Sequence, residues 1–254
     1  YQLPALTNLG TGFGMGLIII GCMVGIKPND GSESFALAGL VGLMGAIIGT
    51  IVSVRIMLYF TKKIFDHNED VLEEIVEEKE NDEVKYKGSI GTRVMNSLIE
   101  GGHQGVKLGL EIIPGILIIC TLVMMLTNTC DTYSGGAYEG IGLLPFLASK
   151  LNFVFKPLFG FTSVECISVP ITALGAAGAA IGLVPNLVAS GLATGNDIAV
   201  FTAMCMCFSG YLSTHVAMMS VLGYPELSGK SIIAHTIGGL CAGISAHLIY
   251  MLIL

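Results

Sequence analysis

Several polar side chains interrupt the long apolar stretches of this chain, and two of them are carboxylates. Glu165 and Glu111 lie inside apolar runs, where an ionisable group is costly and marks a functional site by default. Glu165 ends the run Thr162-Ser163-Val164-Glu165. A helix that starts there within a membrane points free N–H groups and a positive dipole end into a cavity, where a polar or anionic solute binds. The same run also matches a capping box, in which the Glu165 carboxylate accepts a hydrogen bond from the Thr162 N–H.

Glu111 has a similar pair of interpretations. Glu100, Gln104, Lys107 and Glu111 recur at intervals of four, three and four residues, so they share one face of a helix. Glu111 is then either a site residue facing a solute pathway or one half of an i,i+4 pair with Lys107 near the membrane interface.

The densest group of polar side chains is the segment 209–215. Ser209 and Ser213 share a helix face with Thr202, and Thr214 and His215 lie beside them. Ser and Thr within a membrane also bridge helices, and a buried His is often a hydrogen-bonded interior residue. The pair Asn196-Asp197 is an N-cap signal for the helix that contains Thr202. The candidate solute-binding residues are Glu111, Thr162, Ser163, Glu165, Thr172, Asn196, Thr202, Ser209, Ser213, Thr214 and His215.

Soft metal ligands gather in the same part of the chain. Cys205, Cys207, Met218 and His215 suit Cu(I) or Fe(II), but a C-x-C pair on a helix points its sulfurs to different faces, which favours core packing. The chain shows no nucleophile and base pair and no nucleotide-binding signature, so an enzyme is not expected. We expect no resident cofactor; a coupling ion would be H⁺ or Na⁺.

The composition assigns these residues to a membrane protein. Of 254 residues, 53% are hydrophobic and 12% are charged, whereas a soluble domain carries roughly a quarter charged residues. A membrane-spanning helix needs about 20 apolar residues. We therefore predict an all-α polytopic membrane protein with about five full transmembrane helices, at 9–26, 34–60, 108–126, 198–222 and 232–254, plus broken or re-entrant half-helices.

The half-helices are expected between 141 and 193. This stretch stays apolar, yet Pro145, Pro157, Pro170 and Pro185 divide it into pieces too short to span a bilayer. Broken helices at membrane depth are tolerated where they are buried or line a cavity, and they are the best sequence indication of a transport site.

The segment 61–99 is the one long polar stretch. Residues 61–93 hold half of all Lys and Arg, and ten of the nineteen acids lie between Asp66 and Glu83. Because the positive-inside rule counts Lys and Arg, this segment is predicted to be cytoplasmic. The pattern from Asp70 predicts a short amphipathic helix, either a solvated linker or a docking surface. With a net charge of −7 and no basic patch, a nucleic-acid partner is excluded.

Glycine pairs spaced four residues apart predict close helix packing. They are Gly12/Gly16, Gly21/Gly25, Gly45/Gly49, Gly178/Gly182 and Gly239/Gly243. Spacing alone leaves open whether each pair packs within one chain or between chains.

From about 100 to 254 the chain resembles the YjiH-type branch of the nucleoside-recognition, or Gate-domain, membrane proteins. The matching runs are 109–115 (GLEIIPG), 156–162 (KPLFGFT), 170–178 (PITALGAAG), 196–204 (NDIAVFTAM), 209–219 (SGYLSTHVAMM) and 235–239 (HTIGG). The resemblance implies a multi-pass protein of the bacterial cytoplasmic membrane with a transport-like core. It also implies a homo-oligomer or a pair with a related membrane subunit.

The sequence thus divides into an N-terminal pair of helices (1–60), a charged loop (61–99) and a Gate-like core (100–254). The leading hypothesis is a transporter, or transporter subunit, for a small polar solute such as a nucleoside, dipeptide or carboxylate. The alternatives are a gate for Fe(II) or Cu(I), and a structural or assembly component that does not transport.

Overall fold

The computed structural model describes residues 2–27, 34–65, 89–127, 134–135, 139–143, 146, 150, 152–175, 177–209 and 211–253. Within the helices a few side chains also lie outside the description, those of Glu111 and Ser213 among them. The predicted amphipathic helix from Asp70 falls outside the described residues as well.

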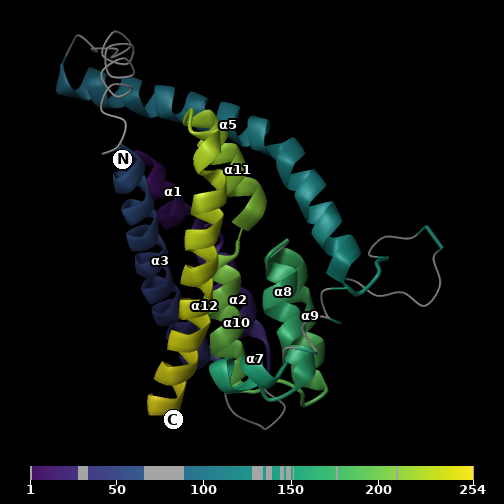
Figure 1. Cartoon of the computed structure of the whole chain (residues 1–254). Coiled ribbons are helices and arrows are strands. Elements are labelled where there is room, and N and C mark those ends of the chain that lie inside the picture. Colours follow the sequence, from purple (N-terminus) through teal and green to yellow (C-terminus); the bar gives the residue numbers. More distant parts are fainter. Residues whose placement is uncertain are drawn as a thin grey trace.

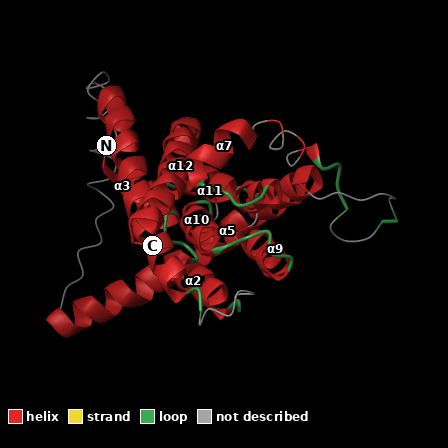
Figure 2. Cartoon of the chain, turned by 90° about the horizontal axis from the view of Figure 1, so that it is seen from below, coloured by secondary structure: helices red, strands yellow, loops and turns green. Residues whose placement is uncertain are grey.

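Every regular element of the described residues is a helix (Figure 1, Figure 2). The first half contains α1 (Gln2–Thr11), α2 (Gly16–Gly25), α3 (Ala36–Phe65) and α5 (Ile90–Thr127). The second half contains α7 (Asn152–Phe159), the 3₁₀ turn η1 (Val164–Ile167), α8 (Ser168–Ala173), α9 (Ala177–Ala189), α10 (Gly195–Cys207), α11 (Tyr211–Val221), η2 (Pro225–Leu227) and α12 (Ser228–Ile253). The all-α prediction is confirmed for this part of the chain.

Three stretches are long and apolar enough to cross a membrane, namely Pro4–Gly25, Ala36–Ile64 and Pro225–Ile253. A fourth arises if Phe153–Phe159 and Val164–Ala173, which meet at 84°, count as one broken span. These lengths indicate a membrane protein. The predicted spans 34–60 and 232–254 coincide with α3 and α12 except for residues 34–35 and 254, and 108–126 lies within the longer α5. The predicted span 198–222 is not one helix, because α10 ends at Cys207 and α11 begins at Tyr211. The predicted span 9–26 is not one helix either, because α1 ends at Thr11 and α2 begins at Gly16.

The broken region is present, but its three described prolines do not set its breaks; Pro145 lies outside the described residues. Pro157, Pro170 and Pro185 all lie inside helices. The chain turns instead at Gly160 (φ 64°) and Gly191 (φ 69°), because only glycine adopts this left-handed backbone without a steric cost. A proline inside a helix removes one backbone hydrogen bond, and these helices continue past each of theirs.

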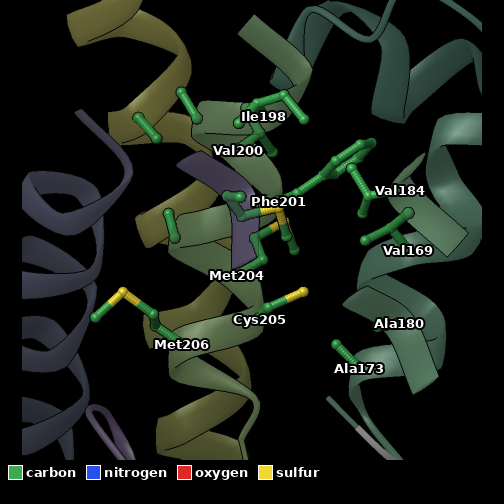
Figure 3. Packing of buried hydrophobic residues seen from close by; sticks show 14 of the residues in the cluster. Val169, Ala173, Ala180, Val184, Ile198, Val200, Phe201, Met204, Cys205 and Met206 are labelled. Carbon is green, nitrogen blue, oxygen red and sulfur yellow. The ribbon is translucent and has the colours of Figure 1, made fainter. Parts of the chain in front are cut away.

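Helix α10 forms the centre of the fold. It is buried along almost its whole length, between α3 and α12 on one side and α8 and α9 on the other. Figure 3 shows Cys205 pointing towards α8 and α9, and Met206 pointing towards α3. The Cys207 thiol donates to the Ala46 carbonyl of α3. Cys205 and Cys207 therefore lie on different faces of α10, as the C-x-C spacing predicts.

Glycine brings α3 and α12 into backbone contact. A Cβ added at Gly49 would lie 2.4 Å from the Gly238 carbonyl oxygen, and one at Gly45 would lie 2.6 Å from that of Ala242. The pair Gly45/Gly49 thus packs within one chain. In contrast, a Cβ at Gly21, Gly25, Gly178 or Gly182 would meet no described atom within 4 Å.

Candidate functional site

Two apolar helices are interrupted, and their interruptions touch. The first lies at 12–15, between α1 and α2, and the second lies between Cys207 and Tyr211, joining α10 to α11. The Ser209 hydroxyl, which donates to the Met206 carbonyl at 2.8 Å, lies 3.5 Å from the Thr11 carbonyl oxygen, and a Cβ on Gly14 would lie 3.2 Å from Ser209 Oγ. Glycine is a poor helix former, and the first interruption falls in the run Gly10-Thr-Gly-Phe-Gly-Met-Gly16.

A fully enclosed polar network lies beside these interruptions. We call it the histidine network; it consists of Asn8, Thr11, Ser53, His215, Ser231 and His235, each at most 3% exposed. These side chains come from α1, α3, α11 and α12. Polar groups buried in an apolar setting need hydrogen-bond partners, and this network supplies them from four separate helices.

Thr11 stands between the two imidazoles. Its Oγ1 lies 3.3 Å from His215 Nε2 and 3.1 Å from His235 Nδ1. The two rings meet edge to face, with centroids 4.7 Å apart. His235 Nε2 is hydrogen-bonded to the Cys207 carbonyl oxygen at the end of α10. The interruption of α10 is therefore stabilised by a side chain from the last helix.

Asn8 and Ser231 complete the network on the other side of His215. Asn8 Nδ2 donates to Ser53 Oγ at 2.7 Å and to the Ser231 carbonyl at 3.1 Å. Ser231 Oγ lies 2.6 Å from Asn8 Oδ1 and 2.8 Å from His215 Nδ1.

A second polar cluster lies at the opposite end of α10, about 20 Å away at 1.5 Å per residue. We call it the Asp197 cluster; its members are Thr162, Thr194, Asn196, Asp197 and His247. The buried Asp197 carboxylate accepts from the N–H groups of Thr162 (3.0 Å) and Thr194 (2.8 Å) and from both hydroxyls. Four donors on one carboxylate hold the turn after α7 against the start of α10.

Asn196 extends this cluster to α12. Its Nδ2 donates to the carbonyls of Phe159 (3.0 Å) and Gly160 (2.9 Å), and its Oδ1 accepts from His247 Nδ1 at 2.8 Å. The N-cap of α10 is Thr194, with Asp197 three residues on as its partner. The prediction that Asn196-Asp197 begins the helix is therefore wrong by two residues.

The cluster borders a groove of about 470 Å³. The groove is lined by Phe153, Lys156, Pro157, Gly160 and Phe161. Apart from Lys156 its lining is apolar. It lies at the bend between α7 and η1, and not at the histidine network.

The structure separates the predicted site residues into groups. His215 belongs to the histidine network and Ser209 adjoins it, whereas Thr162 and Asn196 belong to the Asp197 cluster. Thr202 Oγ1 donates to the Ile198 carbonyl of its own helix at 2.7 Å.

Glu165 is exposed and outside both groups. Its capping-box interpretation is wrong, because the Thr162 N–H donates to Asp197 and the N-cap residue is Ser163. Ser163 and Thr214 are half-buried, and neither bonds to the histidine network. The side chains of Glu111 and Ser213 lie outside the described part of the chain.

Two buried hydroxyls remain without a hydrogen bond of ordinary geometry among the described residues, Thr50 Oγ1 and Thr172 Oγ1. Thr172 is one of the predicted solute-binding residues. Thr50 lies directly against the first interruption, since a Cβ on Gly12 would be 2.3 Å from its oxygen. Its other polar neighbour is the Cys207 thiol, which is a weak hydrogen-bonding group. A buried hydroxyl in this state is available to a bound molecule.

Sequence reasoning missed Asn8, Thr11, Ser53, Ser231 and His235. The spacing contained a signal, since Asn8 and Thr11 are three residues apart and Ser231 and His235 are four apart, which places each pair on one helix face. Among the described residues no three His, Cys, Asp or Glu side chains gather in a metal-binding arrangement.

Comparison with known proteins adds no assignment. No family model, no curated protein and no solved structure matches this chain.

Proposed function

We propose that this protein is an integral membrane transporter, or a transporter subunit, for a small polar solute. The observation that carries the proposal is the meeting of two interrupted helices beside the histidine network. Interrupted helices that meet inside a membrane protein are typical of the substrate sites of secondary transporters. Their free backbone groups need partners there, and here His235 supplies one.

The chemistry of the meeting point favours a neutral polar solute. Its described side chains carry hydroxyl, amide and imidazole groups, from Thr50, Ser209, Asn8 and the two histidines. Such groups recognise the hydroxyl and carbonyl groups of a nucleoside or the amides of a dipeptide. With both imidazoles neutral, a carboxylate solute would have no compensating cation here, because the described Lys and Arg side chains of the surrounding helices are exposed. The nucleoside is therefore our first choice, in agreement with the family resemblance.

Binding is the first test. The purified protein is heated in detergent with a nucleoside, a dipeptide or a dicarboxylate present. A ligand at 100 times its dissociation constant adds about 2.7 kcal/mol of stability. We expect a raised midpoint with the nucleoside and no change with the dicarboxylate.

Uptake into proteoliposomes is the second test, with two matched variants of α3. Thr50→Val removes the hydroxyl that lies against the interruption beside the Cys207 thiol, and it keeps the side-chain shape. Thr61→Val removes an equally buried hydroxyl that bonds only its own helix, at Met57 O (3.0 Å). Loss of one solute hydrogen bond weakens binding by about 1.4 kcal/mol, or roughly tenfold. We expect half-maximal uptake to need about ten times more solute for Thr50→Val only.

Two outcomes of the uptake test would contradict the proposal. If reconstituted protein takes up no member of the solute panel, alone or with a co-purifying subunit, the transporter proposal is wrong. If Thr61→Val impairs uptake as much as Thr50→Val does, the site lies elsewhere.

A further inference from the structure

The histidine network contains a hydrogen-bonding mismatch that one proton removes. The Asn8 amide has a fixed orientation, because its Nδ2 faces the Ser231 carbonyl oxygen, which can only accept. A flipped amide would place two oxygens against each other.

The Asn8 orientation fixes the hydrogen positions of Ser231 and His215. Asn8 Oδ1 lies 2.6 Å from Ser231 Oγ, so Ser231 donates its single hydrogen to Asn8. Ser231 Oγ then accepts from His215, 2.8 Å away, and His215 carries its hydrogen on Nδ1. His235 carries its hydrogen on Nε2, because that nitrogen faces the Cys207 carbonyl.

In the neutral state two bare nitrogens then compete for one hydrogen. His215 Nε2 and His235 Nδ1 both face Thr11 Oγ1, at 3.3 and 3.1 Å. Thr11 has a single hydroxyl hydrogen, which the Thr7 carbonyl oxygen 2.9 Å away also accepts, so at most one of the two nitrogens receives it. The other lone pair faces the lone pairs of the Thr11 oxygen.

One added proton satisfies both rings when Thr11 turns its hydrogen from the Thr7 carbonyl to the second ring. If His215 gains it, His215 Nε2–H donates to Thr11 and Thr11 donates to His235. If His235 gains it, the same two hydrogen bonds run in the opposite direction. The two states interconvert when one ring nitrogen gives its proton to Thr11 and Thr11 gives its own to the other ring. A second proton would set two imidazolium ions at a ring separation of 4.7 Å, where buried like charges repel strongly.

No described charged side chain faces the rings. The nearest titratable groups are Tyr211, whose ring centroid is 5.8 Å from that of His235 and whose hydroxyl bonds Thr236, and the Cys207 thiol, which donates to the Ala46 carbonyl. Asp197 lies at the far end of α10. The described charged side chains of α3, α5, η2 and the start of α12 are exposed, namely Arg55, Lys62, Lys63, Arg93, Glu100, Lys107, Glu226 and Lys230.

We infer that His215 and His235 form a binding site for a single proton, shared through the Thr11 hydroxyl. This inference deepens the proposed function, since it makes H⁺ the coupling ion. The site is enclosed, with both rings at most 1% exposed. Proton exchange with water therefore requires the neighbouring helix interruptions to open, which links protonation to the conformation of the site.

The first test is the tautomer of each ring in the wild-type protein, measured by NMR on ¹⁵N-histidine-labelled protein in lipid nanodiscs without solute. Signals are assigned with His215→Gln and His235→Gln. At pH 8 we expect a protonated Nδ1 on His215 and a protonated Nε2 on His235. The opposite tautomer on either ring would overturn the assignment on which the site rests.

The second test counts protons between pH 8 and pH 4. The wild type should bind one proton more than the double variant His215→Gln/His235→Gln. Thr11→Ser keeps the hydroxyl and should also bind one proton more than that double variant. In both, His215 Nε2 and His235 Nδ1 should shift together, because the proton is shared. In Thr11→Val a single ring should take the whole shift. A difference of zero or two protons, or joint shifts that persist in Thr11→Val, would refute the shared site.

These measurements need no transport, so the two proposals fail separately. One shared proton without solute uptake would support this site and contradict the transporter. Uptake that proceeds with no bound proton would support the transporter and contradict this site.

Discussion

The backbone contact between α3 and α12 yields a prediction whose size follows from the structure. Gly49→Ala places a methyl group where the Gly238 carbonyl oxygen and Ala242 Cβ would be 2.4 and 2.5 Å away. These atoms belong to a helix backbone and to a Cβ, so a helix must move. Overpacking of this kind costs about 1–3 kcal/mol. We expect the upper end of that range, because no flexible side chain can yield.

The matched control is Gly21→Ala in α2, where the added methyl meets no described atom within 4 Å. Both variants gain the same helix propensity, about 1 kcal/mol at most, so their difference isolates the packing cost. A difference of about 3 kcal/mol corresponds to roughly 6–12 °C in unfolding midpoint for a chain of this size. The measurement is thermal unfolding in one detergent. Equal midpoints for the two variants would refute the close approach of α3 and α12.

Three further changes probe the Asp197 cluster, the turn at Gly160 and the histidine network. Asp197→Ala leaves four donors without their carboxylate, so thermal unfolding should show a loss of about 3 kcal/mol or more; a neutral result would contradict the role of the cluster. Gly160→Ala should destabilise more than Gly191→Ala, because both positions have positive φ but only Gly160 abuts a ring, that of His247; equal losses would argue against that contact. Asn8→Ala removes the partner of two buried serines and should cost about 2–3 kcal/mol, with amide hydrogen exchange at the start of α12 rising in parallel; unchanged exchange would contradict the network.

Hydropathy and glycine spacing predicted the parts of the fold that depend on local pattern. Helices α3 and α12 follow from apolar length. The spacing of Gly45 and Gly49 predicted a close helix contact but did not identify α12 as the partner. The breaks were harder to place. Proline was expected to make them, but a proline affects only its own turn, while Gly160 and Gly191 redirect the chain through positive φ.

The candidate site was predicted in part, at His215 and Ser209. Its other members were missed because they meet across the whole chain, since Thr11 is 204 residues from His215 and 224 from His235. The break after Cys207 was missed for the same reason. Its free carbonyl is satisfied by His235, a tertiary contact that hydropathy does not register.

The proposed transport site depends above all on the meeting of the two helix interruptions, and a reversible crosslink tests that meeting directly. Gly14→Cys and Ser209→Cys, in a background without the native cysteines, should form a disulfide on mild oxidation, because a Cβ on Gly14 would lie 3.2 Å from Ser209 Oγ. We predict that oxidation stops solute uptake in proteoliposomes and that a reductant restores it. Full crosslinking with undiminished uptake, or no crosslink at all, would contradict the account.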